Sequence, residues 1–287
     1  MSRFIIYTYQ FAPLQNIIAP SLFESTENIL PVQERMEQKQ IIFQQVFSLP
    51  PDKIFSKGSK KYDARILFNQ GNIVVLRLAN SKRMALEESF QIKEHQYAPS
   101  CLVIIDNRKD AQQIAIEEDH KAFSDTNVVK SILESSFKKF LKPRGLTVTI
   151  QREYKKSEFW KIVNSHQDKI TMVRFHFAYP NLPRVRESVK EVFAEANKLT
   201  NSKHSSFELK AADGESLELE STNDTLNAIV ECSAASGEVI DIKARGLKSF
   251  IKTGKTVRSF ECDDLEARLS PDLINSAINK IVSLFKC

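Results

Sequence analysis

The stretch from Lys169 to Leu199, KITMVRFHFAYPNLPRVRESVKEVFAEANKL, predicts a strand, a sharp turn and a helix. Its first part alternates apolar and polar residues, as a strand with one face in a core requires; the order is Val173, Arg174, Phe175, His176 and Phe177. Pro180 ends this strand, and Pro183 suits the first turn of a helix, where its missing N–H is not needed. Apolar residues then recur at helical spacing as far as Leu199.

Strand and helix patterns of the same kind occur along the rest of the chain. A strand is expected at 4–11, and two hairpins are expected, one joining 64–68 to 73–78 and the other joining 97–105 to 113–117. Helices are expected at 125–141, 157–163, 223–234 and 270–285. These elements predict an α+β fold, with mixed, mainly antiparallel sheets backed by helices.

The length of 287 residues and the apolar content of 42% are enough for two packed cores. We interpret 81–91 as a short helix or a loop and expect a domain boundary close to it. The sequence therefore predicts two modules side by side, a smaller one at 1–92 and a larger one at 93–287.

Several classes of protein do not fit the composition. Glycine is scarce, with 7 residues, and neither GxGxxG nor GxxxxGK[ST] occurs. No CxxC pair occurs, so a zinc ribbon or finger is not expected. No run approaches the ~20 apolar residues of a membrane helix. We expect a cytoplasmic protein with reduced thiols and no cofactor or bound metal; the cysteines are Cys101, Cys232, Cys262 and Cys287.

The net charge of +5 is a mild excess, but one segment concentrates it. No acidic residue lies between Lys243 and Phe260, and Phe250 interrupts the cations. Such a segment can bind phosphates, each cation replacing condensed counterions, although it can also be a solvated hairpin that keeps the protein soluble. The candidate phosphate contacts in this segment are Lys243, Arg245, Lys248, Lys252, Lys255 and Arg258.

Two further cations are weaker candidates. Arg174 points away from the apolar face of its strand, together with His176, and Lys61 belongs to a basic cluster at 53–65 that Asp52 and Asp63 interrupt. A third cluster at 138–144 is better explained by the end of a helix, where cations complement the helix dipole.

A metal-dependent nuclease is an alternative. Asp241 with Lys243, and Glu208 with Lys210, have the D/E-x-K spacing that puts a carboxylate and an ammonium on one face of a strand. A third acidic ligand would have to come from elsewhere, and the candidates are Asp213, Glu220 and Asp224. The acidic run 117–120 is interpreted as a solvated loop, and no spacing supports a Ser/His/Asp or Cys/His site.

The order of several segments resembles a group of prokaryotic phage-defence and phage-exclusion proteins that includes RexA and the Kiwa subunit KwaB. The similar central segments are YAPSCLVIIDN (97–107), QQIAIE (112–117), LTVTIQ (146–151) and DKITMVRFHFAYPN (168–181). FELKAADGES (207–216) and GEVIDIKARG (237–246) follow in the C-terminal part. The resemblance lies in element order over roughly residues 95 to 285 and carries over no functional residue.

The resemblance implies an oligomeric, nucleic-acid-binding defence protein without its own catalytic centre. Together with the charge pattern, it leads us to expect sequence-independent DNA binding in a homo-oligomer, with a second defence protein as a possible partner. Two alternatives stay open: the metal-dependent nuclease, and a protein-interaction subunit whose basic hairpin docks an acidic partner.

Overall fold

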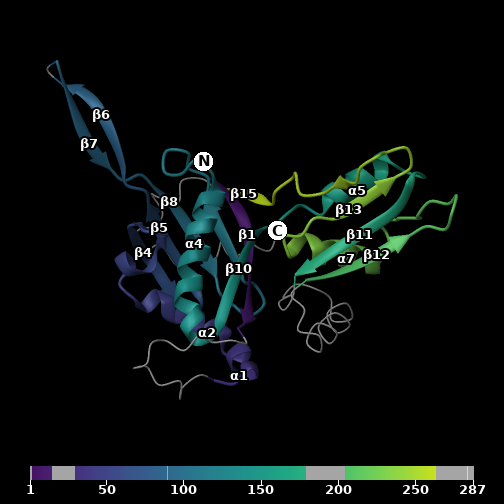
Figure 1. Ribbon diagram of the computed structural model, residues 1–287, viewed down its shortest axis with the longest axis horizontal. Coiled ribbons are helices and arrows are strands. Elements are labelled where there is room, and N and C mark those ends of the chain that lie inside the picture. Colours follow the sequence, from purple (N-terminus) through teal and green to yellow (C-terminus); the bar gives the residue numbers. More distant parts are fainter. Residues whose placement is uncertain (1, 15–29, 89, 179–203, 263–282, 284–287) are drawn as a thin grey trace. The chain divides into compact units, whose positions relative to one another are not determined.

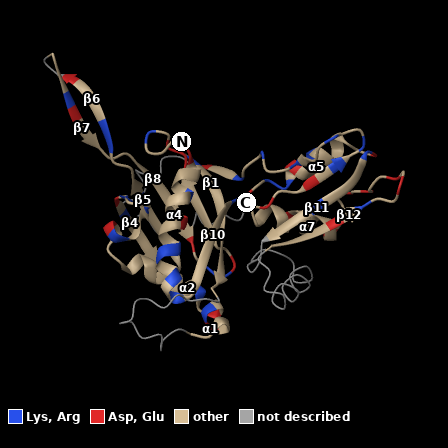
Figure 2. Ribbon diagram, viewed as in Figure 1, with Lys and Arg blue, Asp and Glu red and all other residues tan. Residues whose placement is uncertain are grey.

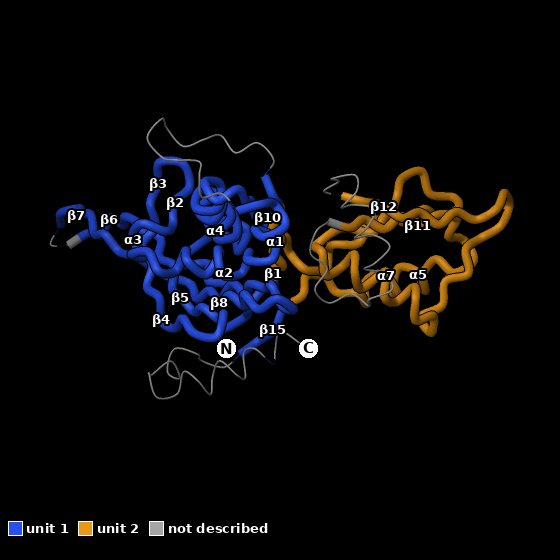
Figure 3. The backbone as a smooth tube through the Cα atoms, turned by 90° about the horizontal axis from the view of Figure 1, so that it is seen from below, with its two compact units in different colours: residues 1–6, 13–150, 259–287 blue, residues 7–12, 151–258 orange. Residues whose placement is uncertain are grey.

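The computed structural model describes residues 2–14, 30–88, 90–178, 204–262 and 283 (Figure 1). The fold is α+β with mainly antiparallel sheets, as predicted. The helices expected after Pro183 and at 270–285 lie outside the described residues, except for Ser283, which is helical. The chain forms two compact units (Figure 3): unit 1 comprises 1–6, 13–150 and 259–287, and unit 2 comprises 7–12 and 151–258.

The larger sheet has seven strands. In spatial order they are β10 (Leu146–Arg152), β1 (Ser2–Pro13), β9 (Gln113–Glu117), β8 (Ser100–Asp106), β5 (Ile73–Ala79) and β4 (Ala64–Gln70), and β15 (Ser259–Cys262) pairs with β1. Both predicted hairpins are present, because β4 pairs with β5 and β8 with β9, each antiparallel. Strand β8 is buried along almost its whole length, which fits a central strand covered on both faces.

The seven-stranded sheet runs across the expected domain boundary. β5 pairs with β8 from Ile73↔Asp106 to Ala79↔Ser100, so the backbone groups on that edge of β5 are satisfied by a strand from beyond residue 93. The two compact units are therefore not the modules 1–92 and 93–287 expected from the sequence, and the position between residues 92 and 93 lies on a strand within unit 1.

Helix α4 (Thr126–Leu141) crosses one face of this sheet (Figure 1). Asp125 caps it, its carboxylate accepting a hydrogen bond from the backbone N–H of Asn127 at 2.5 Å. The fully buried ring of Phe137 lies 4.8 Å from Phe43 and 5.9 Å from Phe47, centroid to centroid. Helix α1 (Val32–Glu37) precedes the short helices that contribute apolar residues to this core, which are α2 (Lys39–Gln44), a 3₁₀ turn (Gln45–Ser48) and α3 (Pro51–Ile54).

Two small ribbons belong to unit 1. β2 (Ser56–Lys57) pairs with β3 (Lys60–Lys61), and β6 (Lys82–Glu88) pairs with β7 (Gln91–Tyr97). The interpretation of 81–91 as a short helix or loop is therefore wrong. The residues form an antiparallel ribbon that extends away from the seven-stranded sheet (Figure 1).

Unit 2 contains a four-stranded sheet in the order β12 (His204–Lys210), β11 (Ile170–Ala178), β13 (Asp241–Ala244) and β14 (Ile251–Lys252). Helices α5 (Ser157–Ser165) and α7 (Asp224–Ala235) supply the core on one face of it. Beyond β14, the segment Ser259–Cys262 is β15 of the larger sheet. No helix in the described parts of the chain is long and apolar enough to cross a membrane.

Phe137→Ala tests the core beneath α4. It removes a fully buried ring that contacts three other aromatic rings, so we expect the free energy of unfolding to fall by about 3–5 kcal/mol. Lys139→Ala, at an exposed position two residues further along the helix, is the control and should change it by less than about 0.5 kcal/mol. Denaturant unfolding measures both, and equal effects would contradict this packing.

Candidate nucleic-acid interface

The side chains of strand β11 point alternately to the two faces of the four-stranded sheet. Val173, Phe175 and Phe177 are buried in the core, as predicted from their alternation. A register shift between Ile170 and Met172 lets Ile170 face the same core. The opposite side is called the polar face, and its residues on the four strands include Met172, Arg174, His176, Glu208, Lys210, Asp241, Lys243 and Lys252.

Charges alternate in a row across the polar face. The strand register places Arg174 between Glu208 on β12 and Asp241 on β13, and it places Lys252 of β14 beside Asp241. Side chains directly opposite each other on neighbouring strands lie close enough to interact, and opposite charges there are favourable. The row therefore reads acid, base, acid, base.

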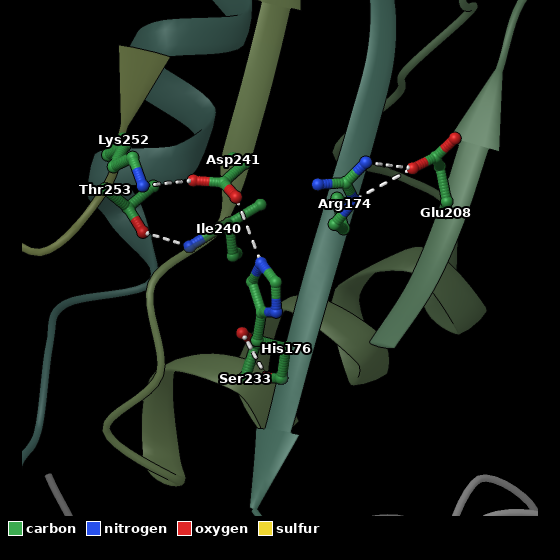
Figure 4. A network of polar contacts seen from close by, with 8 residues as sticks. All are labelled: Arg174, His176, Glu208, Ser233, Ile240, Asp241, Lys252 and Thr253. Atoms are coloured by element: carbon green, nitrogen blue, oxygen red, sulfur yellow. Dashed lines mark hydrogen bonds and ion pairs between the residues drawn. The ribbon is translucent and has the colours of Figure 1, made fainter. Parts of the chain in front are cut away.

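Asp241 is the most buried member of this row, with a side chain 11% exposed. Its Oδ2 accepts a hydrogen bond from Nε2 of His176 at 3.0 Å, and its Oδ1 lies 3.2 Å from Nζ of Lys252 (Figure 4). Burial raises the pKa of Asp241, but the contacts with His176 and Lys252 together outweigh it, so the pKa lies below the ordinary value. The carboxylate is therefore a charged anchor for two neighbouring strands.

Arg174 and Glu208 form the other pair in the row. Nε and Nη2 of Arg174 lie 2.8 and 2.7 Å from Oε2 of Glu208 (Figure 4). Both side chains are more than a third exposed, and an ion pair in solvent contributes only about 0–1 kcal/mol. A phosphate that approaches Arg174 can therefore compete with Glu208 at low cost.

The loop after β13 brings an aromatic ring to the polar face. Nζ of Lys243 donates to the carbonyl oxygens of Leu247 and Lys248, at 2.7 and 2.8 Å, which folds the loop back over the strand. The ring of Phe250 then lies 5.6 Å from Nζ of Lys243 and 5.8 Å from the guanidinium of Arg174. Phe250 remains 37% exposed, so one surface combines an accessible ring with two cations.

Lys210, which lies outside the basic segment that begins at Lys243, also belongs to this surface. Met172 pairs with Lys210 on one side and with Lys243 on the other, so the two lysines flank one methionine. The signal was the spacing of Glu208 and Lys210, which puts both residues on the same side of β12. Lys210 is exposed.

The structure brings only part of the predicted basic set together, and Lys and Arg residues occur on elements of both units (Figure 2). Arg174, Lys243 and Lys252 lie on the polar face, and Lys248 is exposed on the adjoining loop. Nη2 of Arg245 donates to the carbonyl oxygens of Gly214 and Glu215 at 2.7 and 3.2 Å.

The remaining members of the set lie elsewhere. Arg258 pairs with Glu153 at 2.8 Å in a largely buried contact, with side chains 19% and 1% exposed. Lys61 lies on β3, in unit 1. Lys255 has an exposed side chain, but its backbone is held by Glu158.

Glu158 on α5 fixes the end of the basic segment. Its buried carboxylate accepts hydrogen bonds from the backbone N–H groups of Gly254, Lys255 and Thr256, at 3.2, 3.1 and 2.8 Å. Successive N–H groups that converge in this way form a site for an anion, and here the protein's own carboxylate occupies it. These N–H groups therefore hold the segment 254–256 against α5 and are not assigned to the binding of a phosphate.

The polar face does not bring the nuclease candidates together as ligands of one metal. Glu208 and Asp241 lie on strands separated by β11, so their backbones are roughly 10 Å apart, with Arg174 between them. Within the described residues, no three His, Cys, Asp or Glu side chains are grouped so that they could hold a metal ion.

The acidic run at 117–120 has structural contacts. Glu117 accepts hydrogen bonds from Oγ of Ser2 and the backbone N–H of Leu102, and Glu118 pairs with Arg3 at 3.1 Å. These contacts tie the ends of strands in the seven-stranded sheet to one another.

Comparison with known proteins identifies no family for this chain. No protein-family model matches the chain, and no curated protein matches it. The function proposed below therefore rests on the polar face and on the resemblance in segment order.

Asp241→Asn tests the anchor of the polar face. Because the pKa of Asp241 is lowered on folding, its charge stabilises unit 2 above the ordinary aspartate pKa of about 3.9, and this contribution is lost as the pH falls through the lowered value. We expect the variant to lose roughly 1–3 kcal/mol of unfolding free energy near neutral pH and to approach the wild type in strong acid.

Denaturant unfolding across the acid range measures this difference. Asp213→Asn, at an exposed position of the same unit, is the control and should behave like the wild type at every pH. A loss for Asp241→Asn that is the same at acidic and neutral pH would contradict the assigned role of the charge.

Proposed function

We propose that the polar face of unit 2 binds nucleic acid without catalysis and without sequence preference. The proposed ligand is DNA. The biological setting we propose is anti-phage defence or phage exclusion, as the resemblance in segment order implies. The observation that carries the proposal is the exposed ring of Phe250 between Arg174 and Lys243.

The residue types on this surface support the binding of a single strand. Proteins that bind single-stranded nucleic acid combine cations that follow the phosphates with aromatic rings on which bases stack. Here Lys243 supplies a cation 5.6 Å from the ring of Phe250, and Arg174 supplies a planar guanidinium 5.8 Å from it. Lys210 and Lys248 add exposed cations on the polar face and on the adjoining loop. All of them belong to unit 2, so the proposed surface needs no contribution from unit 1.

The acids of the polar face limit the affinity without preventing binding. Glu208 is exposed, and its pair with Arg174 costs little to exchange for a phosphate contact. Asp241 is more buried and keeps Lys252 beside it. We therefore assign the main phosphate contacts to Arg174, Lys210, Lys243 and Lys248, with Lys252 at the margin.

Lys210→Ala combined with Lys248→Ala tests the electrostatic part. Both lysines are exposed, and within the described residues neither side chain has an acidic partner whose loss would disturb the fold. We expect binding to weaken equally for unrelated DNA sequences, and the slope of log affinity against log salt to fall by roughly 0.7–0.9 for each lysine removed. Fluorescence anisotropy with labelled oligonucleotides over a salt series measures both quantities.

The matched control for this pair is Lys57→Ala with Lys61→Ala, which removes the same charge from the β2–β3 ribbon of unit 1. It should leave the salt slope close to that of the wild type. Binding that does not depend on salt, or an equal loss in both double variants, would contradict the proposal.

Phe250→Ala tests the stacking part. Loss of one base–aromatic contact should weaken binding of single-stranded DNA by about 1–3 kcal/mol and binding of duplex DNA by much less. Phe250→Tyr keeps a ring at the same place and should restore most of the affinity. A variant that loses the same affinity for both forms of DNA would point to a contribution that is only electrostatic.

A further inference from the structure

The β6–β7 ribbon of unit 1 is a two-stranded sheet that stands apart from the other sheets. All of its described side chains are exposed except that of Lys82, including the apolar residues Met84, Leu86 and Ile92. An isolated ribbon of two strands is marginally stable in water, and its unpaired edges are templates for another strand. These features indicate that the ribbon is completed by a partner.

The tip of the ribbon gives a second indication. Phe90 is 98% exposed and has a φ of 65°, a backbone conformation that is unfavourable for a bulky residue. Glycine or asparagine would make this turn without strain. A strained and fully exposed aromatic residue therefore suggests a contact that the single chain does not provide.

The sequence of β6 is complementary to itself. If two copies of β6 run antiparallel with Ala85 opposite Ala85, then Arg83 lies opposite Glu87 of the second copy and Met84 lies opposite Leu86 of the second copy. The two-fold symmetry makes each of these pairs occur twice. The ionic pairs lie on one face of the combined sheet and the apolar pairs on the other, because residues alternate along a strand.

The other edge of the ribbon lacks this property. An antiparallel pairing of β7 with a second β7 centred on the middle of the strand would place Glu94 opposite itself and Lys93 opposite His95. Like charges directly opposite each other are unfavourable. In this central register, charge favours pairing at the β6 edge over pairing at the β7 edge.

We propose that the protein forms a homodimer through its β6 strands, which join two ribbons into a four-stranded sheet in the order β7, β6, β6, β7. A second copy of the chain fits better than a nucleic acid, because the segment 82–97 carries three basic and three acidic residues. In this register each tip extends past Lys82 of the other copy, so Phe90 reaches the base of the partner ribbon. The dimer interface is separate from the polar face and does not depend on the proposed function.

Charge exchange at two positions tests this register. Arg83→Glu and Glu87→Arg each replace two favourable pairs across the interface by two repulsive ones, so each variant alone should dimerise at least tenfold more weakly, which corresponds to about 1.4 kcal/mol. Arg83→Glu also removes the pair of Arg83 with Glu94 of its own ribbon, at 3.8 Å, which is exposed to solvent screening and contributes little. An equimolar mixture should recover dimers as heterodimers, because all the pairs across the interface are then opposite in sign. The combined variant should again form homodimers.

Sedimentation velocity over a concentration series measures the dissociation constants, and circular dichroism checks that each variant is folded. Lys57→Glu, an equal change of charge on the β2–β3 ribbon, is the control and should dimerise like the wild type. A wild-type protein that stays monomeric, single variants that dimerise as well as the wild type, or a mixture without heterodimers would each overturn the proposal.

Discussion

The ion pairs around Asp241 hold the polar face of unit 2 together. Its carboxylate joins β13 to β11 through His176 and to β14 through Lys252. These two contacts favour the charged carboxylate by more than its burial disfavours it. Without the Asp241 carboxylate, the contacts with His176 and Lys252 would be lost. The surface that presents Phe250 is built beside it, on the next part of the same strands.

The two main sheets bury their strands in different ways, and this difference decides where a ligand can bind. β8 is buried along its length inside the seven-stranded sheet, so the sheet offers no polar surface there. The four-stranded sheet packs on α5 and α7 with one face, which leaves the other face for polar side chains. The β6–β7 ribbon is the third case, since every described side chain on its two faces is exposed except that of Lys82.

The sequence predicted elements whose signals are local and strong. The alternation in β11 and the two hairpins of the larger sheet depend on neighbouring residues, and they are present. The pairing of β5 with β8 was not predictable, because hydrogen bonds between distant segments leave no local pattern. The ribbon at 82–97 was missed for a related reason, since its strands have too few apolar residues for a clear period.

The candidate site was predictable as a segment but not as a surface. The run of cations after Lys243 pointed to unit 2, whereas the pairs that hold Arg245 and Arg258 arise from residues far away in the sequence.

Lysine-labelling mass spectrometry of the full chain, with and without single-stranded DNA, tests the central claim most directly. If the polar face binds DNA, single-stranded DNA will protect Lys210, Lys243 and Lys248 and leave Lys57 and Lys61 as reactive as before. Protection of the unit 1 lysines alone, with those of the polar face unchanged, would contradict it.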